Sequence, residues 1–530
     1  MRFLPVGPST ILVELADLDA TLALFDSLTR TPLEDVEEVV PAARTLMIRL
    51  RTDASAEAVA AALATRDLSS RNAGTPRTVE IPVVYDGEDL AESAERLGID
   101  TDELIRRHTE AGYTVAFTGF APGFAYLSAP DADLTVPRRK TPRTKIPAGA
   151  VGLAGAFSGI YPRESPGGWQ IIGTTPLVMF DPEREPPTLL EPGDRVKFNR
   201  IDRMPDRPAA RPAARPVSEA PGLRVLSVEI PVLVQDMGRP GLAAMGVSVS
   251  GALDRGSLAA ANVAVGNPIG AAGLEITLGG VALGAERDVT IALTGAPARI
   301  EIRTQEGQTI VAPHGRAFRL AAGDEVRLAA PSRGMRSYLA VAGGLDLPLV
   351  MQSAATDTLA GIGPAALKAG DRLAIGTSSE PPAASKPQAP RSLPTSEDQV
   401  TLDVILGPRT DWFTEDAVRL LAGQDWLVTP ESSRVGIRLA GAEPLERAIT
   451  DELPSEGTVR GALQVPPSGQ PVLFLSDHPL TGGYPVIGSI APHQLDLAGQ
   501  IPIGARIRLA PVAPFAEITP ETTSKSETPS

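Results

Sequence analysis

Arginines next to glycines are the residues whose type and spacing most clearly suggest chemistry in this sequence. Arg239 lies in the segment Gln235–Gly241 (Q-D-M-G-R-P-G), and Arg434 and Arg438 lie on either side of Gly436. Side chains four residues apart on a strand share a face, so the last two would act together. A guanidinium can hold a carboxylate or phosphate through two hydrogen bonds. We therefore predict catalytic, anion-binding roles for the three arginines, with local ion pairing or plain solvation as the alternatives.

A polar loop at residues 476–485, S-D-H-P-L-T-G-G-Y-P, is the second candidate. The imidazole of His478 can act as a general base near neutral pH, and Asp477 precedes it directly. We predict catalytic roles for both residues; a solvated loop histidine is the alternative. The loop also supplies four predicted ligand contacts, namely Thr481, Gly482, Gly483 and Tyr484.

Two segments of the N-terminal half have the composition of a binding pocket. Residues 117–127 (F-T-G-F-A-P-G-F-A-Y-L) combine aromatic rings with glycines that let a ligand approach the backbone. Residues 137–149 concentrate positive charge in an acidic protein. A packed aromatic turn and a solvated basic loop are the alternatives. The ligand contacts predicted here are Phe120, Pro122, Gly123, Phe124, Arg138 and Arg143.

The composition argues against several other functions. The 530 residues include 49 Lys and Arg and 64 Asp and Glu, a net charge of −15, so we expect no nucleic-acid or membrane partner. There is no cysteine and there are four histidines without a close pair, so we predict no metal site. The sequence contains no P-loop, no G-x-S-x-G elbow and no biotin-type Met-Lys-Met segment. Without a signal peptide or an apolar run of about 18 residues, the cytoplasm is the expected location.

The elements that would position these residues are mostly short strands. The 50 glycines and 51 prolines mark many turns, and Pro- and Ala-rich stretches at 203–221 and 377–398 predict linkers. In the first 78 residues the apolar spacing predicts an α+β domain with strands and helices at Ile11–Leu15, Asp17–Leu28, Leu46–Leu50 and Ala54–Thr65.

The two halves of the chain repeat a phrase. Residues 167–173 read G-G-W-Q-I-I-G and residues 482–488 read G-G-Y-P-V-I-G. A Pro-Gly entry precedes each phrase, and a glycine turn into an alternating strand follows each, at 192–198 and 503–509. Chance reuse of a hairpin turn is the alternative, but matched flanks favour two related β-barrels. Paired barrels can form a site between them.

These phrases together resemble a known family. The first half resembles the B subunit of bacterial ATP-dependent 5-oxoprolinase, the family of the sporulation kinase inhibitor and of the former allophanate hydrolase subunit 1. The second half resembles the C subunit of the same enzyme, formerly allophanate hydrolase subunit 2. The resembling text includes 117–127, 137–149, 160–169, 236–241, 250–254, Ala261-Asn262, Leu274-Glu275, 336–340, 464–471 and 481–485.

The resemblance implies a fold, a reaction and partners. The fold would be mainly β with α+β parts: two cyclophilin-like β-barrel halves and a small N-terminal α+β domain. The chain would use ATP with Mg²⁺ to open 5-oxoproline, a small cyclic amide, to glutamate. It would work together with a separate A subunit, and a homo-oligomer is also possible. The resemblance adds the ligand contacts Gly167, Gly168, Trp169, Asn262, Gln464 and Gln470. The expected domains are 1–78 (α+β), 79–202 (barrel of the B-like half), 203–221 (linker), 222–376 (first β domain of the C-like half), 377–398 (linker), 399–511 (second β domain) and 512–530 (disordered tail).

The sequence departs from the family in two places. Residues 352–356 read Q-S-A-A-T where the family often has Gly-Ser-Arg-Ser/Thr, and His478 stands where the family often has arginine. Both changes could alter the substrate. Two other functions therefore stay open. One is a biotin-dependent urea or amide carboxyltransferase that accepts carboxybiotin from a separate carrier chain; the other is a histidine-kinase inhibitor fused to its antagonist.

Overall fold

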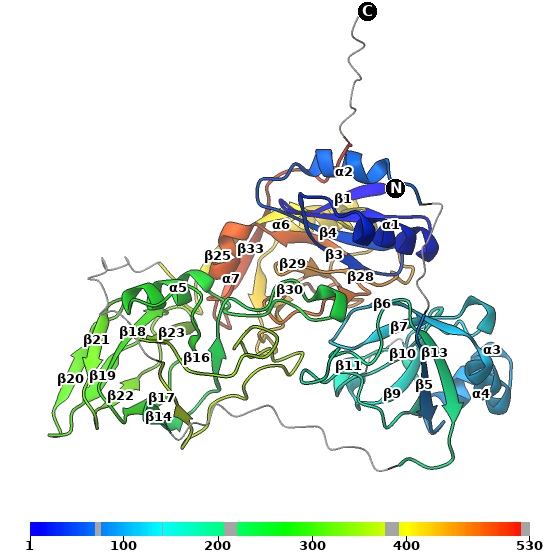
Figure 1. Ribbon diagram of the computed structural model, residues 1–530. Helices are drawn as coiled ribbons and strands as arrows, with labels where there is room; N and C mark the ends of the chain where they lie inside the picture. Colours follow the sequence, from blue (N-terminus) through cyan, green and yellow to red (C-terminus); the bar gives the residue numbers. More distant parts are fainter. Residues whose placement is uncertain (69–75, 140, 142, 206–219, 377–391, 521–530) are drawn as a thin grey trace, which may run out of the picture.

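The computed structural model describes residues 1–68, 76–139, 141, 143–205, 220–376 and 392–520. Most of the predicted linkers 203–221 and 377–398, and residues 521–530 of the predicted tail, lie outside this part of the chain. The sheets form a small N-terminal domain, a first barrel, a sandwich and a second barrel (Figure 1).

The N-terminal domain is a four-stranded sheet with two helices, as the sequence predicts. Its strand order is β1-β2-β4-β3. Asp17 caps the first helix by accepting a hydrogen bond from the N–H of Ala20 at 2.8 Å, and Ser55 caps the second. The elements are β1 (Arg2–Gly7), β2 (Thr10–Glu14), α1 (Leu18–Arg30), β3 (Val36–Pro41), β4 (Thr45–Leu50) and α2 (Ala56–Ala64).

The first barrel is a seven-stranded sheet of order β12-β9-β10-β7-β6-β13-β5. A bridge between Val84 and Thr174 joins its two ends, so the sheet curls on itself. The first and last strands in sequence are parallel neighbours. The elements are β5 (Thr78–Val83), α3 (Leu90–Leu97), α4 (Thr101–Glu110), β6 (Tyr113–Thr118), β7 (Ala125–Ser128), β8 (Arg143–Ile146), β9 (Ala150–Ala154), β10 (Phe157–Ile160), β11 (Ser165–Gly167), β12 (Gln170–Thr174) and β13 (Arg195–Arg200).

The second barrel is closed, in the order β25-β32-β29-β30-β27-β26-β33. Its first and last strands are again parallel neighbours. The elements are β25 (Gln399–Leu406), α6 (Glu415–Gly423), β26 (Trp426–Val428), β27 (Gly436–Ala440), β28 (Glu456–Gly457), β29 (Ala462–Gln464), β30 (Val472–Phe474), β31 (Thr481–Gly482), β32 (Val486–Ile490), α7 (Leu495–Ala498) and β33 (Arg506–Pro511).

The two barrels have the same topology. Read from the first strand, β5-β12-β9-β10-β7-β6-β13 corresponds one to one to β25-β32-β29-β30-β27-β26-β33. The repeated Gly-Gly phrases lead into the equivalent strands β12 and β32, and the repeated glycine turns lead into β13 and β33. The sequence-based prediction of two related barrels is therefore confirmed.

Between the barrels in sequence lies a sandwich of two antiparallel sheets, ordered β20-β19-β22-β17-β14-β24 and β15-β16-β23-β18-β21. One large apolar cluster fills the space between the sheets. The elements are β14 (Leu223–Val228), β15 (Val232–Gln235), α5 (Arg255–Ala264), β16 (Gly273–Thr277), β17 (Val281–Ala285), β18 (Val289–Gly295), β19 (Ile300–Arg303), β20 (Thr309–Ala312), β21 (Ala317–Leu320), β22 (Glu325–Leu328), β23 (Arg336–Val341) and β24 (Arg372–Leu373).

The chain ends and the second barrel come together in space. In Figure 1 the N-terminal domain lies over the second barrel, with the first barrel and the sandwich below on opposite sides. Ser489 of β32 donates a hydrogen bond to the carbonyl of Val6, and the N–H of Ile518 donates to the carbonyl of Phe3 at 2.8 Å. These hydrogen bonds therefore tie β1 both to the second barrel and to the segment that follows β33.

Candidate functional site

The two barrels meet along a seam between the aromatic loop of the first and the Gly-Gly-Tyr loop of the second. The backbone N–H of Phe120 donates to Oγ1 of the buried Thr481 at 2.8 Å. A Cβ on Gly119 would lie 2.5 Å from the same oxygen, so only glycine allows this approach. The two segments were predicted to bind a ligand. In the structure they contact each other instead.

Buried aromatic rings fill the first-barrel side of the seam. Phe124 contacts Trp169 and Tyr161 edge-on, with ring centroids 5.2 and 5.3 Å apart. Gly167 lies against the Tyr161 hydroxyl, where a Cβ would be 2.2 Å from Oη. The predicted aromatic wall is therefore a packed cluster.

Backbone groups of the remaining predicted contacts are also satisfied within the protein. The N–H of Gly123 donates to the carbonyl of Met245 at 3.2 Å, and the carbonyl of Gly168 accepts from the N–H of Arg139 at 2.8 Å. Pro122 is buried beside them. The contact of Gly123 joins the first barrel to the segment before the sandwich helix, whereas that of Gly168 lies within the first barrel.

Arg138 crosses the seam. Its guanidinium donates to Ser455 Oγ at 3.1 Å and pairs with Glu452 at 3.1 Å. It covers Gly483 so closely that a Cβ there would lie 1.9 Å from Nη1. Arg138 therefore links the first barrel to the second.

Arg143 has carboxylate partners within its own barrel. It binds Asp89 with both Nη atoms, at 2.7 and 2.8 Å, and Glu88 at 2.9 Å. Burial would raise the pKa of Asp89, but Arg143, the N–H of Ile171 and Arg139 outweigh burial and lower it. The predicted basic loop is thus largely neutralised.

A buried ionic network joins the sandwich to the second barrel. Arg434 donates to both carboxylate oxygens of Asp477, at 2.9 and 3.0 Å, and to Glu275. Burial opposes the charge of Arg434, but the two carboxylates outweigh it and raise its pKa. Burial likewise opposes the charges of Asp477 and Glu275, yet the arginine keeps the pKa of each below its usual value. All three groups are therefore charged.

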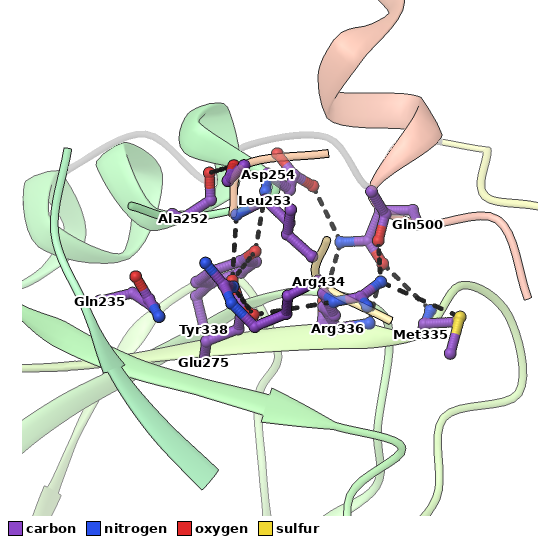
Figure 2. Close-up of polar contacts among 12 residues, drawn as sticks. Gln235, Ala252, Leu253, Asp254, Glu275, Met335, Arg336, Tyr338, Arg434 and Gln500 are labelled. Carbon is purple, nitrogen blue, oxygen red and sulfur yellow. Dashed lines mark hydrogen bonds and ion pairs between the residues drawn. The ribbon is translucent and has the colours of Figure 1, made fainter. Parts of the chain in front are cut away.

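Figure 2 shows how the network continues through the sandwich. Tyr338 donates to Glu275 at 2.8 Å and accepts from the backbone N–H of Asp254 at 2.8 Å. The amide of Gln500 links Asp254, at 2.9 Å, to the carbonyl of Arg336, at 2.8 Å. These contacts fix the loop that precedes α5.

A second group of polar contacts links the segment 239–250 to residues 355–357 and to Asp477. Arg239 is buried and donates to the carbonyl of Ala355, while its Nε and Nη1 have no hydrogen-bond partner among the described residues. Ser248 donates to Asp357 at 3.1 Å, and Ser250 donates to Asp477 at 2.6 Å. Burial, and then the charge of Asp477, raises the pKa of Asp357 to about 6.

The structure corrects the prediction that Arg434 and Arg438 share a strand face. β27 begins at Gly436, so Arg434 lies before the strand and turns into the ionic network. Arg438 lies within β27 and is exposed. The two side chains therefore cannot act on one ligand.

Three predicted polar contacts bind neighbouring backbone instead. Asn262 donates to the carbonyl of Ala271 at 2.7 Å, and Gln470 accepts from the N–H of Gly441 at 2.7 Å. Gln464 packs over Gly482 and donates to the carbonyl of Tyr484 at 3.2 Å. Each stabilises the end of a helix or a loop.

A cavity of about 730 Å³ opens where the N-terminal domain, the loop 237–255 and the second barrel meet. His478 is the one predicted site residue that lines it within the described part of the chain. Arg49, Arg255 and Arg460 contribute positive charge, and Ser248 and Ser250 contribute hydroxyls. Ser250 has a φ of 54°, which is costly for a residue with a side chain and common at functional sites.

His478, which lines this cavity, has a defined protonation state. Its Nδ1 lies 2.9 Å from the carbonyl of Pro479, which can only accept, so Nδ1 carries the proton of the neutral ring. The ring stacks on Phe474. Burial lowers the pKa of His478 to about 4, so at neutral pH Nε2 is free of a proton.

The described residues show no group of three or more histidine and acidic side chains that could hold a metal ion. In the same residues, no helix has the length and apolar character needed to cross a membrane.

Local sequence signals for the residues around the cavity are weak. Glu275, Arg336 and Ser250 lie in segments that resemble the family, although the sequence alone assigns them no role. Arg255 and Arg460 occur in ordinary contexts, L-D-R-G-S and T-V-R-G-A. Only the packing of segments about 200 residues apart brings them together, as Arg460 donates to the carbonyl of Leu253 at a separation of 207 residues.

Comparison with protein families identifies the class of protein. Residues 245–511 match the carboxyltransferase domain, subdomains A and B, and residues 1–190 match the carboxyltransferase domain, subdomains C and D. The chain therefore belongs to the carboxyltransferase-domain family.

Within this family, the chain is similar to subunits of 5-oxoprolinase and to one solved structure. Over 288 residues, 54% of this chain and 89% of the relative, the chain is 37% identical to the 5-oxoprolinase C subunit of Escherichia coli strain K12. Over 203 residues, 36% of this chain and 93% of the relative, it is 38% identical to the 5-oxoprolinase B subunit of Escherichia coli O157:H7. The crystal structure of TTHA0988 superposes with a TM-score of 0.80 at 34% identity, covering 94% of this chain and 99% of that one. The chain thus carries B-like and C-like sequences in one polypeptide.

Proposed function

We propose that this chain is the fused B and C component of an ATP-dependent 5-oxoprolinase that works with a separate A subunit. The proposal rests on the observation that both halves of the chain contribute residues to the wall of the cavity. Residues 6–10 and 37–49 come from the B-like half, and residues 237–255 and 458–495 come from the C-like half. A site with this construction needs both parts, which agrees with relatives that are named as the B and C subunits of one enzyme.

The size and charge of the cavity suit the substrate. Small-molecule sites occupy roughly 300–1,000 Å³, and about 730 Å³ lies within this range. The ring of 5-oxoproline has an apolar hydrocarbon edge beside its polar lactam group, and its carboxylate is an anion. Apolar residues such as Val40, Met47 and Leu480 line the cavity together with arginines.

The chemistry requires that a stable lactam becomes open to attack by water. ATP with Mg²⁺ supplies the phosphoryl group that activates the lactam oxygen. We assign to His478 Nε2 the removal of a proton from the attacking water, since this nitrogen is unprotonated at neutral pH. Breaking the ring C–N bond then leaves an amine, which takes up a proton, and a γ-carboxyl phosphate. A second water hydrolyses this acyl phosphate to glutamate and inorganic phosphate.

A second candidate function is carboxyl transfer, because the matching family models are named carboxyltransferase domains. In this alternative the cavity would accept a carboxyl group from the carboxybiotin of a separate carrier chain and pass it to urea or another amide. The ionic network and the cavity would serve this reaction equally well, so an experiment must separate the two.

A parallel assay of the purified chain separates these functions. One arm measures glutamate formed from 5-oxoproline and ATP with the A-type protein present; the other measures carboxyl transfer from carboxybiotin to urea. We expect product only in the first arm. Product only in the second arm would replace the proposed function with carboxyl transfer.

A further inference from the structure

Two arginines of the cavity come from different elements and hold the same loop. Arg255 begins α5, and its Nη2 donates to the carbonyl of Ser250 at 3.2 Å. Arg460 lies between β28 and β29, and its Nη2 donates to the carbonyl of Leu253 at 2.6 Å. One edge of each guanidinium is thus fixed by backbone, which positions the rest of the group at the cavity.

Among the described residues, Arg255 and Arg460 share one acidic neighbour, Asp496, whose charge acts on both. Asp496 forms an ion pair with Arg460, in which Oδ1 lies 3.8 Å from Nη2. Asp496 accepts from the backbone N–H groups of Arg255 and Gly256, at 3.1 and 3.0 Å. The Nε atoms of Arg255 and Arg460 are buried without a hydrogen-bond partner among the described residues. Buried donors of charged groups are costly when unpaired.

The third arginine of the cavity differs from these two. Arg49 pairs with Glu37 and with Glu38, each at 3.1 Å. Its charge is therefore balanced by the acidic residues of the cavity wall. Arg255 and Arg460 differ because they share one carboxylate, Asp496, between two positive charges.

The electrostatics of the pair agree with this geometry. Burial lowers the pKa of Arg460 to about 10, and repulsion by Arg255 adds to the effect. Burial also lowers the pKa of Arg255. Both groups remain charged at neutral pH and share the single charge of Asp496, so an anion in the cavity beside them would relieve their repulsion.

We propose that Arg255 and Arg460 form a clamp for the carboxylate of a small monocarboxylic substrate. The identity of that substrate as 5-oxoproline rests on the proposed function, whereas the clamp itself rests on the geometry of the cavity. The clamp would orient the substrate by its charged end and leave the rest of the molecule facing His478 and the apolar wall.

Binding to the intact chain tests the clamp. Isothermal titration would compare L-5-oxoproline with 2-pyrrolidone, which has the same lactam ring without the carboxylate, for the chain alone and with the A-type protein. We expect 2-pyrrolidone to bind at least about tenfold more weakly. The variants R255Q and R460Q should each weaken binding of 5-oxoproline by about ten- to a hundredfold, because a charge-assisted hydrogen bond is lost.

Arg447 provides the matched control. It lies in the same barrel, donates to the carbonyl of Val465 at 2.8 Å and also has a buried, unpartnered Nε, but it does not line the cavity. R447Q should bind 5-oxoproline like the parent chain. Thermal unfolding of all three variants shows whether the chain still folds, and R460K, which keeps the charge, should retain part of the affinity.

The outcomes separate the clamp from the proposed function. If R255Q and R460Q bind as tightly as R447Q, or if no carboxylate binds with or without the A-type protein, the clamp is wrong. Glutamate production with an unchanged KM in R460Q would reject the clamp and keep the oxoprolinase. Arginine-dependent carboxylate binding without glutamate production would keep the clamp and reject the oxoprolinase.

Discussion

Arg434 shows how burial decides the role of a charged residue. From the sequence, Arg434 is suited either to bind an anion or to lie on a solvated strand face. In the structure it holds Asp477 and Glu275, two carboxylates that are almost completely buried. These three charges stabilise the contact between the sandwich and the second barrel only as a set, because each would be costly alone.

Replacing Arg434 should therefore destabilise the protein strongly. We expect R434M to lower the free energy of unfolding by about 3–5 kcal/mol, since it leaves two buried carboxylates without their partner. The exposed R438M, on β27, should stay within about 0.5 kcal/mol of the parent chain. Urea unfolding followed by fluorescence of Trp412 and Trp426, both in the second barrel, measures the difference. Equal effects of the two variants would show that the network does not stabilise the fold.

The lowered pKa of His478 predicts that the free energy of unfolding depends on pH. Its pKa is about 4 in the folded protein and about 6.5 when exposed, so the unfolded chain binds more protons between these values. The free energy of unfolding should therefore fall as the pH drops from about 6.5 toward 4. His108, fully buried against Tyr85 and Ser158 with its pKa lowered by burial to about 3, acts in the same direction.

The variant H478Q isolates the contribution of one histidine. It should reduce the loss of stability between pH 6.5 and 4 by up to about 3 kcal/mol, while the contribution of His108 remains. Urea titrations at several pH values provide the measurement. An unchanged slope in H478Q would mean that His478 is exposed to solvent.

At the scale of elements, the strands and helices were largely predictable and the site was not. Glycine turns followed by apolar alternation marked one strand in each barrel, β13 and β33, and apolar spacing marked β2, β4, α1 and α2 of the N-terminal domain. The repeated Gly-Gly phrase predicted the duplication, because the same turn leads into the same strand. Arg255 and Arg460 were missed because nothing local distinguishes a clamp from a surface arginine.

The seam between the barrels depends on the absence of a side chain at Gly119, directly after β6. In G119A the new Cβ would lie 2.5 Å from Thr481 Oγ1, and Thr481 is buried and β-branched. We expect a loss of about 1–3 kcal/mol from this crowding. At Gly112, directly before the same strand, a Cβ would have no neighbouring atom within 4 Å, so G112A is the matched control. Similar thermal stabilities of G119A and G112A would indicate that the barrels are not in contact there.

At the scale of the whole molecule, ion pairs join the N-terminal domain, which belongs to the B-like half, to the second barrel of the C-like half. Arg409 of the second barrel, which is 2% exposed, pairs with Glu14 of β2 at 3.0 Å and with Glu456. Arg2 pairs with Glu14 at 2.8 Å and with Asp411 at 2.9 Å. The B-like and C-like halves are thus joined by buried contacts as well as by the chain.

Cutting the chain should therefore not separate the halves. A protease site inserted within residues 206–219 would allow the purified protein to be cleaved after folding. We expect the two fragments to elute together in size-exclusion chromatography, and to separate more readily in the variant R409M, which leaves Glu456 buried without its partner. Elution of the cleaved parent protein as two separate species would show that the linker alone joins the halves.

We propose that this one chain supplies both the B-like and the C-like parts of an oxoprolinase. The most direct test measures glutamate formed from 5-oxoproline and ATP by the intact chain with the A-type protein, with each protein alone as a control. We expect glutamate only when both proteins are present, in proportion to the ATP consumed. No glutamate from the folded mixture would contradict it.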